Sequence, residues 1–294
     1  MKTQRCFPAL LVCTLLSAAP AASAPHCRSP NLTIPDGNTT GVTDSMVIST
    51  EGSLADLNVV VKIDHTWVGD LIVVLSHVNT NTSVTIIDRP GRTTSGNGCG
   101  SDNIDVTLDD QAVASVENQC PPVGGTFQPN NPLSVFNGQS LAGTWTLNVS
   151  DRSAIDTGTL VQWCLLPTTE QEAWRQFYFG SPDNSGEGAD DADPDGDGHD
   201  NAFEFTAGLS PIDPTSRFRL RIEAITGQPE HKTIIFSPIV AGRTYVVRSK
   251  ASLLDPTWNP LTSYTTADAG DERTVTDLLG AGPMKFYHVE ITRP

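Results

Sequence analysis

The sequence predicts a mostly β protein in which two β-sandwiches are joined by a short helix and an acidic loop. At 294 residues the chain is longer than one typical domain. Its 24 glycines and 21 prolines, with 38% hydrophobic residues, are typical of many short strands and turns, so helix should be scarce. Apolar residues recur at period two in residues 57–63 and 71–75, as in strands with one buried face.

The N-terminus has the pattern of a secretory signal peptide, expected to cover residues 1–24. A basic segment precedes an apolar run from Cys6 to Leu16, which is too short to span a bilayer, and small residues follow. We expect cleavage after Ala24 or, because Pro25 would hinder that cut, after Ala21. The mature protein is therefore expected to be secreted or extracellular, in a periplasm or at a cell surface.

The formal net charge of −16 argues against nucleic acid and anionic membranes as partners, because both attract positive surfaces. After the signal peptide, no apolar segment is long enough for a membrane span. An acidic surface suits cations, although most of this charge serves solubility. No pattern in the sequence indicates an oligomeric state.

The first sandwich is expected in residues 25–167. Trp145 alternates with polar neighbours, which points its indole inward, and Trp163 should pack in a similar way. Both are predicted to be core residues and not a ligand platform. The expected strands are residues 46–48, 57–63, 71–75, 83–87, 104–108, 144–149 and 160–166.

A polar corner, residues 65–71 with the sequence HTWVGDL, joins the two clearest strands. This strand-corner-strand arrangement resembles the P domain, also called Homo B, which follows the catalytic domain in subtilisin-like proprotein convertases. The resemblance implies a jelly-roll-like β-sandwich. Further segments follow in the family's order over about 130 residues: residues 34–36 (IPD), 127–129 (FQP), 132–138 (PLSVFNG), 143–147 (GTWTL) and 151–163.

The resemblance implies a non-catalytic domain that packs against and stabilises a protease domain. His65 and Asp70 could belong to a triad, but the chain has no G-x-S-x-G elbow and no subtilisin-like nucleophile turn, so we do not expect an enzyme. His65 is expected to be a satisfied corner residue, and Asp70 to cap the turn or bind calcium. Two functions follow: an accessory module that binds extracellular macromolecules, or a component of serine endopeptidase proteolysis that stabilises a subtilisin-like protease in trans.

Four cysteines remain after the signal peptide, and an even number in an exported chain predicts disulfides. Cys27 and Cys164 bracket the first sandwich, whereas Cys99 and Cys120 flank an excursion rich in Gly and Asp. We therefore predict the pairs Cys27–Cys164 and Cys99–Cys120. A metal site is the competing interpretation, but no close C-x-x-C pair is present.

Residues 168–214 are expected to hold a helix and a calcium-loop linker. The helix should run from Thr168 to Gly180, with a Thr N-cap and acidic residues in the first turn. Residues 181–191 are rich in Gly and Asp and are expected to be a linker.

The segment from Asp193 to Glu204 has the ligand order of an EF-hand calcium loop, with Gly198 at the sharp turn. A helix is expected over residues 201–207, closed by Gly208, and no helix directly precedes the loop. The segment therefore resembles a dockerin or thrombospondin type 3 calcium loop. The predicted Ca²⁺ ligands are the side chains of Asp193, Asp195, Asp197, Asn201 and Glu204 and the backbone carbonyl of His199.

Residues 215–294 are expected to form a small C-terminal β-sandwich. They resemble the C-terminal modules that accompany such calcium linkers in secreted bacterial proteins, which implies no particular activity. Trp258 and Tyr264 could line a sugar-binding surface, but core or edge packing is the favoured interpretation. The expected strands are residues 218–225, 232–236, 244–248, 273–276 and 286–291.

Overall fold

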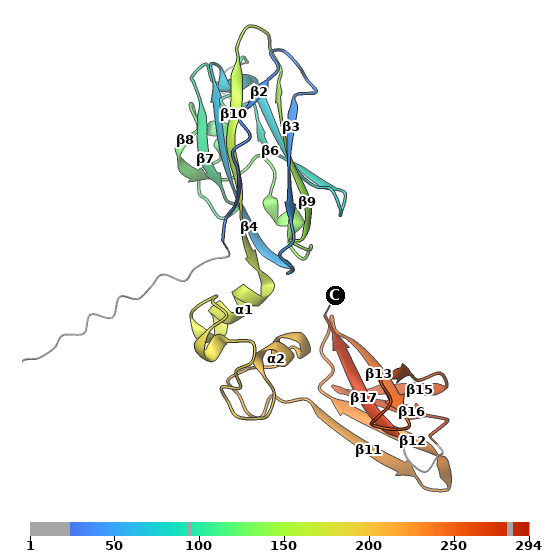
Figure 1. Ribbon diagram of the computed structural model, residues 1–294. Coiled ribbons are helices and arrows are strands. Elements are labelled where there is room, and N and C mark those ends of the chain that lie inside the picture. The colour runs from blue at the N-terminus through green and yellow to red at the C-terminus, as the bar shows by residue number, and fades with distance from the viewer. Residues whose placement is uncertain (1–23, 93–95, 281–284, 294) are drawn as a thin grey trace, which may run out of the picture.

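The computed structural model describes residues 24–92, 96–280 and 285–293. Two β-sandwiches lie at opposite ends of the molecule, with the two α-helices between them (Figure 1). The mostly β fold predicted from the sequence is confirmed. The predicted signal peptide, apart from Ala24, lies outside the described residues. Neither α-helix in the described part of the chain has the length and apolar content needed to cross a membrane.

The first sandwich consists of two sheets packed face to face. One sheet has the order β1 (His26–Arg28), β10 (Gly158–Thr169), β4 (Leu54–His65), β7 (Ile104–Leu108) and β8 (Val123–Phe127), and β2 (Leu32–Ile34) also pairs with β10. The facing sheet has the order β3 (Val42–Ile48), β9 (Gly143–Asp151), β5 (Leu71–His77) and β6 (Thr82–Asp88). Short 3-10 helices complete it: η1 (Val68–Asp70), η2 (Val116–Asn118) and η3 (Leu133–Phe136).

Alternation along β4 explains why this strand is central. Leu57, Val59, Val61 and Ile63 are buried, while the residues between them are only partly covered. Burial of each such side chain contributes about 1.5–3 kcal/mol. Trp145 and Trp163 are also fully buried, which agrees with the predicted core role of both indoles.

The two disulfides of the sandwich follow the pairing expected from the sequence. Cys27 and Cys164 are direct partners in the β1–β10 register and are bonded to each other. Cys99 is bonded to Cys120. The first bond ties the edge strand β1 to β10, and the second closes a loop above the corner between β4 and β5.

Helix α1 (Glu170–Phe179) begins directly after β10 with a capping box between Thr169 and Glu172, and it ends at Gly180. Helix α2 (Asn201–Ala207) has its N-cap at Asp200 and ends at Gly208, with the bounds predicted from the sequence. Both C-terminal glycines adopt left-handed backbone conformations, which a side chain would disfavour.

The segment between these helices is folded, in contrast to the open linker expected over residues 181–191. It contains η4 (Gly186–Gly188), and Asp190 accepts hydrogen bonds from Gln171 and Arg175 of α1, the latter over 2.6 Å. The backbone of Asp190 in turn accepts from Ala202 of α2. Asp190 thus holds the two helices together.

The C-terminal module is a smaller sandwich. One sheet has the order β11 (Arg219–Ile225), β12 (Gln228–Ser237), β16 (Glu272–Asp277) and β15 (Tyr264–Ala269), and the other has β14 (Asn259–Pro260), β13 (Thr244–Lys250) and β17 (Phe286–Thr292). Its core consists of Ile234, Phe236, Val247, Val275 and Val289. Strands β14 and β15 were not anticipated from the sequence, since β15 is polar and exposed along its length.

Two arginines join the C-terminal module to the helices. Arg243 donates to the backbone carbonyl of Phe205 in the last turn of α2. Arg293, just after β17, lies over the Phe205 ring and forms an ion pair with Glu170 of α1. Phe205 of α2 therefore contacts the C-terminal module through both arginines, and one of them, Arg293, also reaches α1.

Candidate calcium site

The acidic loop between η4 and α2 is closed by hydrogen bonds from its own backbone. The carboxylate of Asp193 accepts from the amides of Gly196 and Gly198, at 2.9 and 3.0 Å. Both glycines have positive φ angles, 72° and 96°, which a tight turn requires and other residues seldom adopt. The turn brings the carboxylates of Asp193, Asp195 and Asp197 together, with one oxygen from each lying within 4.8 Å of the others.

Helix α2 carries the other two predicted side-chain ligands, Asn201 and Glu204. Asn201 and Glu204 are three residues apart and so share one face of the helix. Both residues are buried: the exposed fraction is 1% for Asn201 and 0% for Glu204. The side-chain nitrogen of Asn201 donates to the carbonyls of Glu187 and Ala189, each over 2.7 Å. These two bonds hold the side-chain amide of Asn201 through its nitrogen, and the amide oxygen takes no part in them.

Five buried side-chain oxygens here have no hydrogen-bond partner among the described residues. Buried polar atoms are nearly always satisfied, and leaving one unpaired costs about 1–3 kcal/mol. Five such atoms on the loop and the start of α2 are therefore consistent with a bound ligand that accepts electron pairs. They are Asp195 Oδ2, Asp197 Oδ2, Asn201 Oδ1, Glu204 Oε1 and Glu204 Oε2.

The electrostatics of Glu204 agree with this interpretation. Burial, together with the negative charges of Asp195 and Asp197, raises the pKa of Glu204 to about 8. Such a carboxylate is unfavourable in the folded loop unless a positive charge compensates it. The donor set consists of hard oxygens without sulfur or imidazole, which fits Ca²⁺.

The ring of His199 takes no part in this cluster. Its Nε2 lies 3.2 Å from the carbonyl of Phe218, and the ring stacks on Phe203 with centroids 4.5 Å apart. The backbone carbonyl of His199 is the group predicted as a calcium ligand, and that role stays a prediction. The ring instead connects the loop to the start of the C-terminal module.

The corner between β4 and β5 holds the other predicted site residues. The His65 side chain is completely buried, with Nε2 3.5 Å from the equally buried carboxylate of Asp151. The amide of Trp67 donates to His65 Nδ1 over 3.1 Å. Because both ring nitrogens face protein groups and none of the ring is exposed, His65 cannot reach a substrate from the solvent.

Asp70 is also buried, and the guanidinium of Arg89 lies 3.4 Å from its carboxylate. Burial raises the pKa of Asp70, and the charge of Asp151 adds to the effect. The arginine compensates the charge that a cation would otherwise have to balance, and whether Asp70 caps the turn or binds calcium stays a prediction. Among the described residues, the carboxylate cluster close enough to share a cation is that of Asp193, Asp195 and Asp197.

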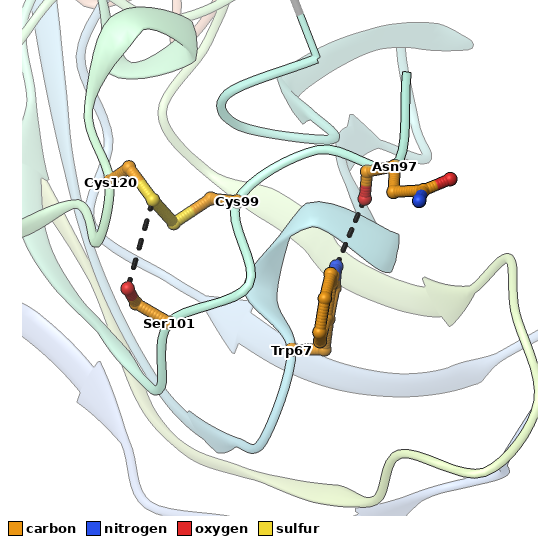
Figure 2. The surroundings of a disulfide bond; sticks show 5 residues. All are labelled: Trp67, Asn97, Cys99, Ser101 and Cys120. Atoms are coloured by element: carbon orange, nitrogen blue, oxygen red, sulfur yellow. Dashed lines mark hydrogen bonds between the residues drawn. A yellow bond between two sulfur atoms is a disulfide. The ribbon is translucent and has the colours of Figure 1, made fainter. Parts of the chain in front are cut away.

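The second disulfide packs directly on this corner, and Figure 2 shows the surroundings of the bond. Trp67 Nε1 donates to the carbonyl of Asn97 over 2.9 Å, and the amide of Gly69 donates to the carbonyl of Cys99. A Cβ at Gly69 would lie 2.3 Å from the Cys99 nitrogen. The glycine in HTWVGDL is therefore needed for the loop to approach the corner.

Several contacts of these sites carry no local sequence signal. Asp151, the partner of His65, lies 86 positions after it. Glu187, whose carbonyl accepts from Asn201, lies 14 positions before it. No sequence motif links the two members of either pair. The match of Asp193 to Glu204 to a known ligand spacing was a usable signal, whereas the supporting contacts depend on how the chain folds back.

Distant likenesses to solved structures cover about half of this chain. The serine protease of Aeromonas sobria in complex with its chaperone gives 15% identity and a TM-score of 0.34, over 52% of this chain and 28% of that chain. The serine protease of Aeromonas sobria gives 17% identity and a TM-score of 0.32, over 50% and 27%. The VP2 subviral particle of infectious bursal disease virus gives 10% identity and a TM-score of 0.27, over 55% and 38%.

This chain thus spans well under half of those chains, and no curated protein matches it. One family model does match, that of the proprotein convertase P-domain, over residues 54–166. The matched region runs from the start of β4 to the last strand of the first sandwich and includes the corner from His65 to Asp70. Residues 54–166 are therefore similar to the proprotein convertase P-domain, as the order of motifs in the sequence indicated.

Proposed function

We propose that this chain is an exported, non-catalytic accessory protein whose P-domain-like sandwich is a binding module and whose helical junction is stabilised by calcium. The observation that carries the proposal is the set of five partnerless buried oxygens around Glu204. A bound Ca²⁺ would satisfy them and neutralise the charge gathered in the loop. The residues that would hold it are Asp193, Asp195, Asp197, Asn201 and Glu204, with the backbone of His199.

Calcium binding can be measured directly on the whole chain. Isothermal titration of the purified, chelator-treated protein with CaCl₂ should give one site per chain, and magnesium should bind more weakly because it demands a stricter octahedral geometry. Absence of calcium binding at millimolar concentration would return the loop to the role of a solvated acidic segment.

The non-catalytic part rests on His65, whose side chain is buried against Asp151 and Trp67. An activated nucleophile needs a base that can contact it and the substrate. We expect no labelling of the purified protein by a serine-directed fluorophosphonate probe, and no hydrolysis of peptide substrates with basic cleavage sites. Stoichiometric labelling of one serine would overturn this part of the proposal.

A second candidate function is the stabilisation of a subtilisin-like protease in trans, which the family match over residues 54–166 favours. In that case the sandwich would bind a catalytic domain supplied by another chain. Pull-down from the culture fluid of the native host should then enrich a serine protease, and adding this chain should raise the melting temperature of that protease. An accessory module for other macromolecules would enrich no protease.

A further inference from the structure

Strand β11, residues 219–225, lies at the free edge of the four-stranded sheet in the C-terminal module. Among the described strands it pairs only with β12. It runs along the outer margin of the module, away from the first sandwich (Figure 1). Six of its seven residues are exposed, all except Ile225. An edge of this kind presents unpaired backbone groups to any strand that can pair with it.

The orientation of the backbone shows which groups face outward. Glu223 and Thr233 are direct partners in the β11–β12 register, and the Thr233 hydroxyl donates to the Glu223 carbonyl over 3.1 Å. That carbonyl therefore points toward β12. Because backbone groups alternate in direction along a strand, those of Leu220, Ile222 and Ala224 point to the free edge.

The side chains of this strand differ from those that usually protect an edge. Leu220 and Ile222 lie opposite Phe236 and Ile234, which are buried in the core, yet remain 42% and 49% exposed themselves. They extend the core face of the sheet past the point where the smaller sheet covers it. Natural edge strands commonly avoid such apolar extensions.

The charges on the other face of β11 would match opposite charges on a second copy of the same strand. If two copies of β11 pair antiparallel about Ile222, each Arg221 lies opposite Glu223 of the partner subunit, and each Leu220 lies opposite Ala224 of the partner subunit. Within one chain the side chains of Arg221 and Glu223 form an ion pair at 3.0 Å, and both remain more than half exposed, at 52% and 56%. Opposite charges in direct cross-strand pairs stabilise a sheet, and like charges destabilise it.

We propose that β11 is a dimerisation edge whose occupant is β11 of a second copy of this chain, paired antiparallel about Ile222. The two four-stranded sheets then form one continuous sheet. Strand β11 carries two arginines and one glutamate in a chain of net charge −16, so repulsion between copies is locally low. The proposal is independent of the calcium site and of any protease partner.

The test uses reciprocal charge reversal in the full chain. Glu223→Arg places arginine opposite arginine across the proposed dimer. The other variant combines Arg221→Glu with Glu272→Arg, because Arg221 also pairs with Glu272 of its own chain at 2.7 Å and the double change keeps that pair in reversed polarity. Both variants lose the pair between Arg221 and Glu223 within one chain, so this loss is the same for each variant and for their mixture. It places glutamate opposite glutamate. Each variant alone should therefore dimerise at least about tenfold more weakly than the wild type.

An equimolar mixture of the two variants should restore dimers, since every arginine then meets a glutamate. Sedimentation velocity and light scattering, with calcium present, should give twice the chain mass for the wild type and for the mixture at concentrations where each variant alone is a monomer. Circular dichroism and melting temperature check that both variants are folded.

Two results would overturn the proposal. One is a wild type that stays monomeric up to about 1 mM, the weakest dissociation constant that is still useful for a specific contact. The other is a dimer that neither variant weakens, which would place the interface elsewhere. Binding of β11 to a foreign extended peptide without self-association gives the first result and counts against the second copy as occupant.

Discussion

Glu204 is the residue on which the proposed calcium site depends most, because both of its buried oxygens lack a partner in the described structure. We expect Glu204→Gln to remove most of the stabilisation by calcium, since an amide offers one neutral ligand oxygen in place of a bidentate carboxylate. For the wild type this stabilisation is about 2.7 kcal/mol at a hundredfold excess over the dissociation constant. Titration calorimetry and melting with and without calcium measure both quantities.

Glu230→Gln is a matched control for that prediction. Its carboxylate lies in the C-terminal module and is half exposed, with only a 4.0 Å approach to His231. The control should bind calcium as the wild type does. If Glu204→Gln retains the full calcium-dependent shift, the ligand assignment from the loop spacing is wrong.

The stability of the first sandwich should depend on pH through the carboxyl group of Asp44. The bidentate hydrogen bond from Arg28 holds the pKa of this carboxyl below its ordinary value of 3.8, with a smaller contribution from Trp163. A lowered pKa in the folded state means that the stabilisation is present above pH 3.8 and is lost as the pH falls through the folded value. Below that pKa, the free energy of unfolding of the wild type should approach that of a variant without this carboxylate.

We therefore expect Asp44→Asn to lower the free energy of unfolding by about 1 kcal/mol at neutral pH, because Arg28 is partly exposed and its pairing is screened. The difference should shrink as the pH falls below 3.8 and through the lowered pKa of the folded state. Urea unfolding at neutral pH and across this range measures it. Asp105→Asn, which removes an exposed pair with Lys62, should change stability by less than about 0.5 kcal/mol. A constant effect of Asp44→Asn across pH would contradict the assignment.

At the scale of elements, the corner between β4 and β5 is held by the loop that the Cys99–Cys120 bond closes. Gly69 has no room for a side chain, because a Cβ there would meet the backbone of Cys99 at 2.3 Å. Gly69→Ala should therefore destabilise the sandwich by about 1–3 kcal/mol, the usual cost of overpacking. Gly96 lies three residues before Cys99, and a Cβ there would meet no described atom within 4 Å, so Gly96→Ala should be tolerated. Equal effects of the two substitutions in chemical denaturation would refute this account.

The helices form a second unit at this scale. Helix α1 is tied to the following segment through Arg175 and Asp190, and that segment orients Asn201 on α2. The calcium ligands thus depend on contacts of residues that lie outside the ligand loop itself. We infer that the junction and its cation form one cooperative unit.

For the whole molecule, this coupling predicts calcium-dependent protection of the junction. Without a cation, repulsion among four carboxylates and the poor nucleation of a seven-residue helix should open the segment between residues 181 and 201. Endoproteinase Glu-C, which needs no calcium, should then cut the full chain at Glu187 in chelator and leave it intact in calcium. Mass spectrometry of the fragments identifies the site.

The first sandwich should survive that digestion as a stable fragment, because two disulfides and its own core hold it. Equal rates of cleavage at Glu187 with and without calcium would show that the segment does not respond to the ion.

The local sequence alone was sufficient for features whose signals lie within a few residues. Helix α2 was predicted with its observed bounds from Glu204 in its first turn and the closing Gly208, and the structure adds Asp200 as its N-cap. Strand β7 was predicted with its observed bounds, whereas β4, β5 and β9 were predicted in place but shorter than observed, because period-two alternation marks the buried face and not the strand ends. The spacing of oxygen-bearing side chains from Asp193 to Glu204 led to the calcium-loop hypothesis, which stays a prediction.

Contacts between distant parts of the chain required the tertiary structure. The burial of His65 against Asp151, the folding of residues 181–191 around Asp190, and the exposed edge of β11 have no local signature. Polar strand β15 was missed because its pairing with β16, and not its own pattern, makes it a strand. The physical reason is that periodicity and capping are encoded by neighbours in sequence, whereas the choice of which buried group meets which partner is made only when remote segments close on one another.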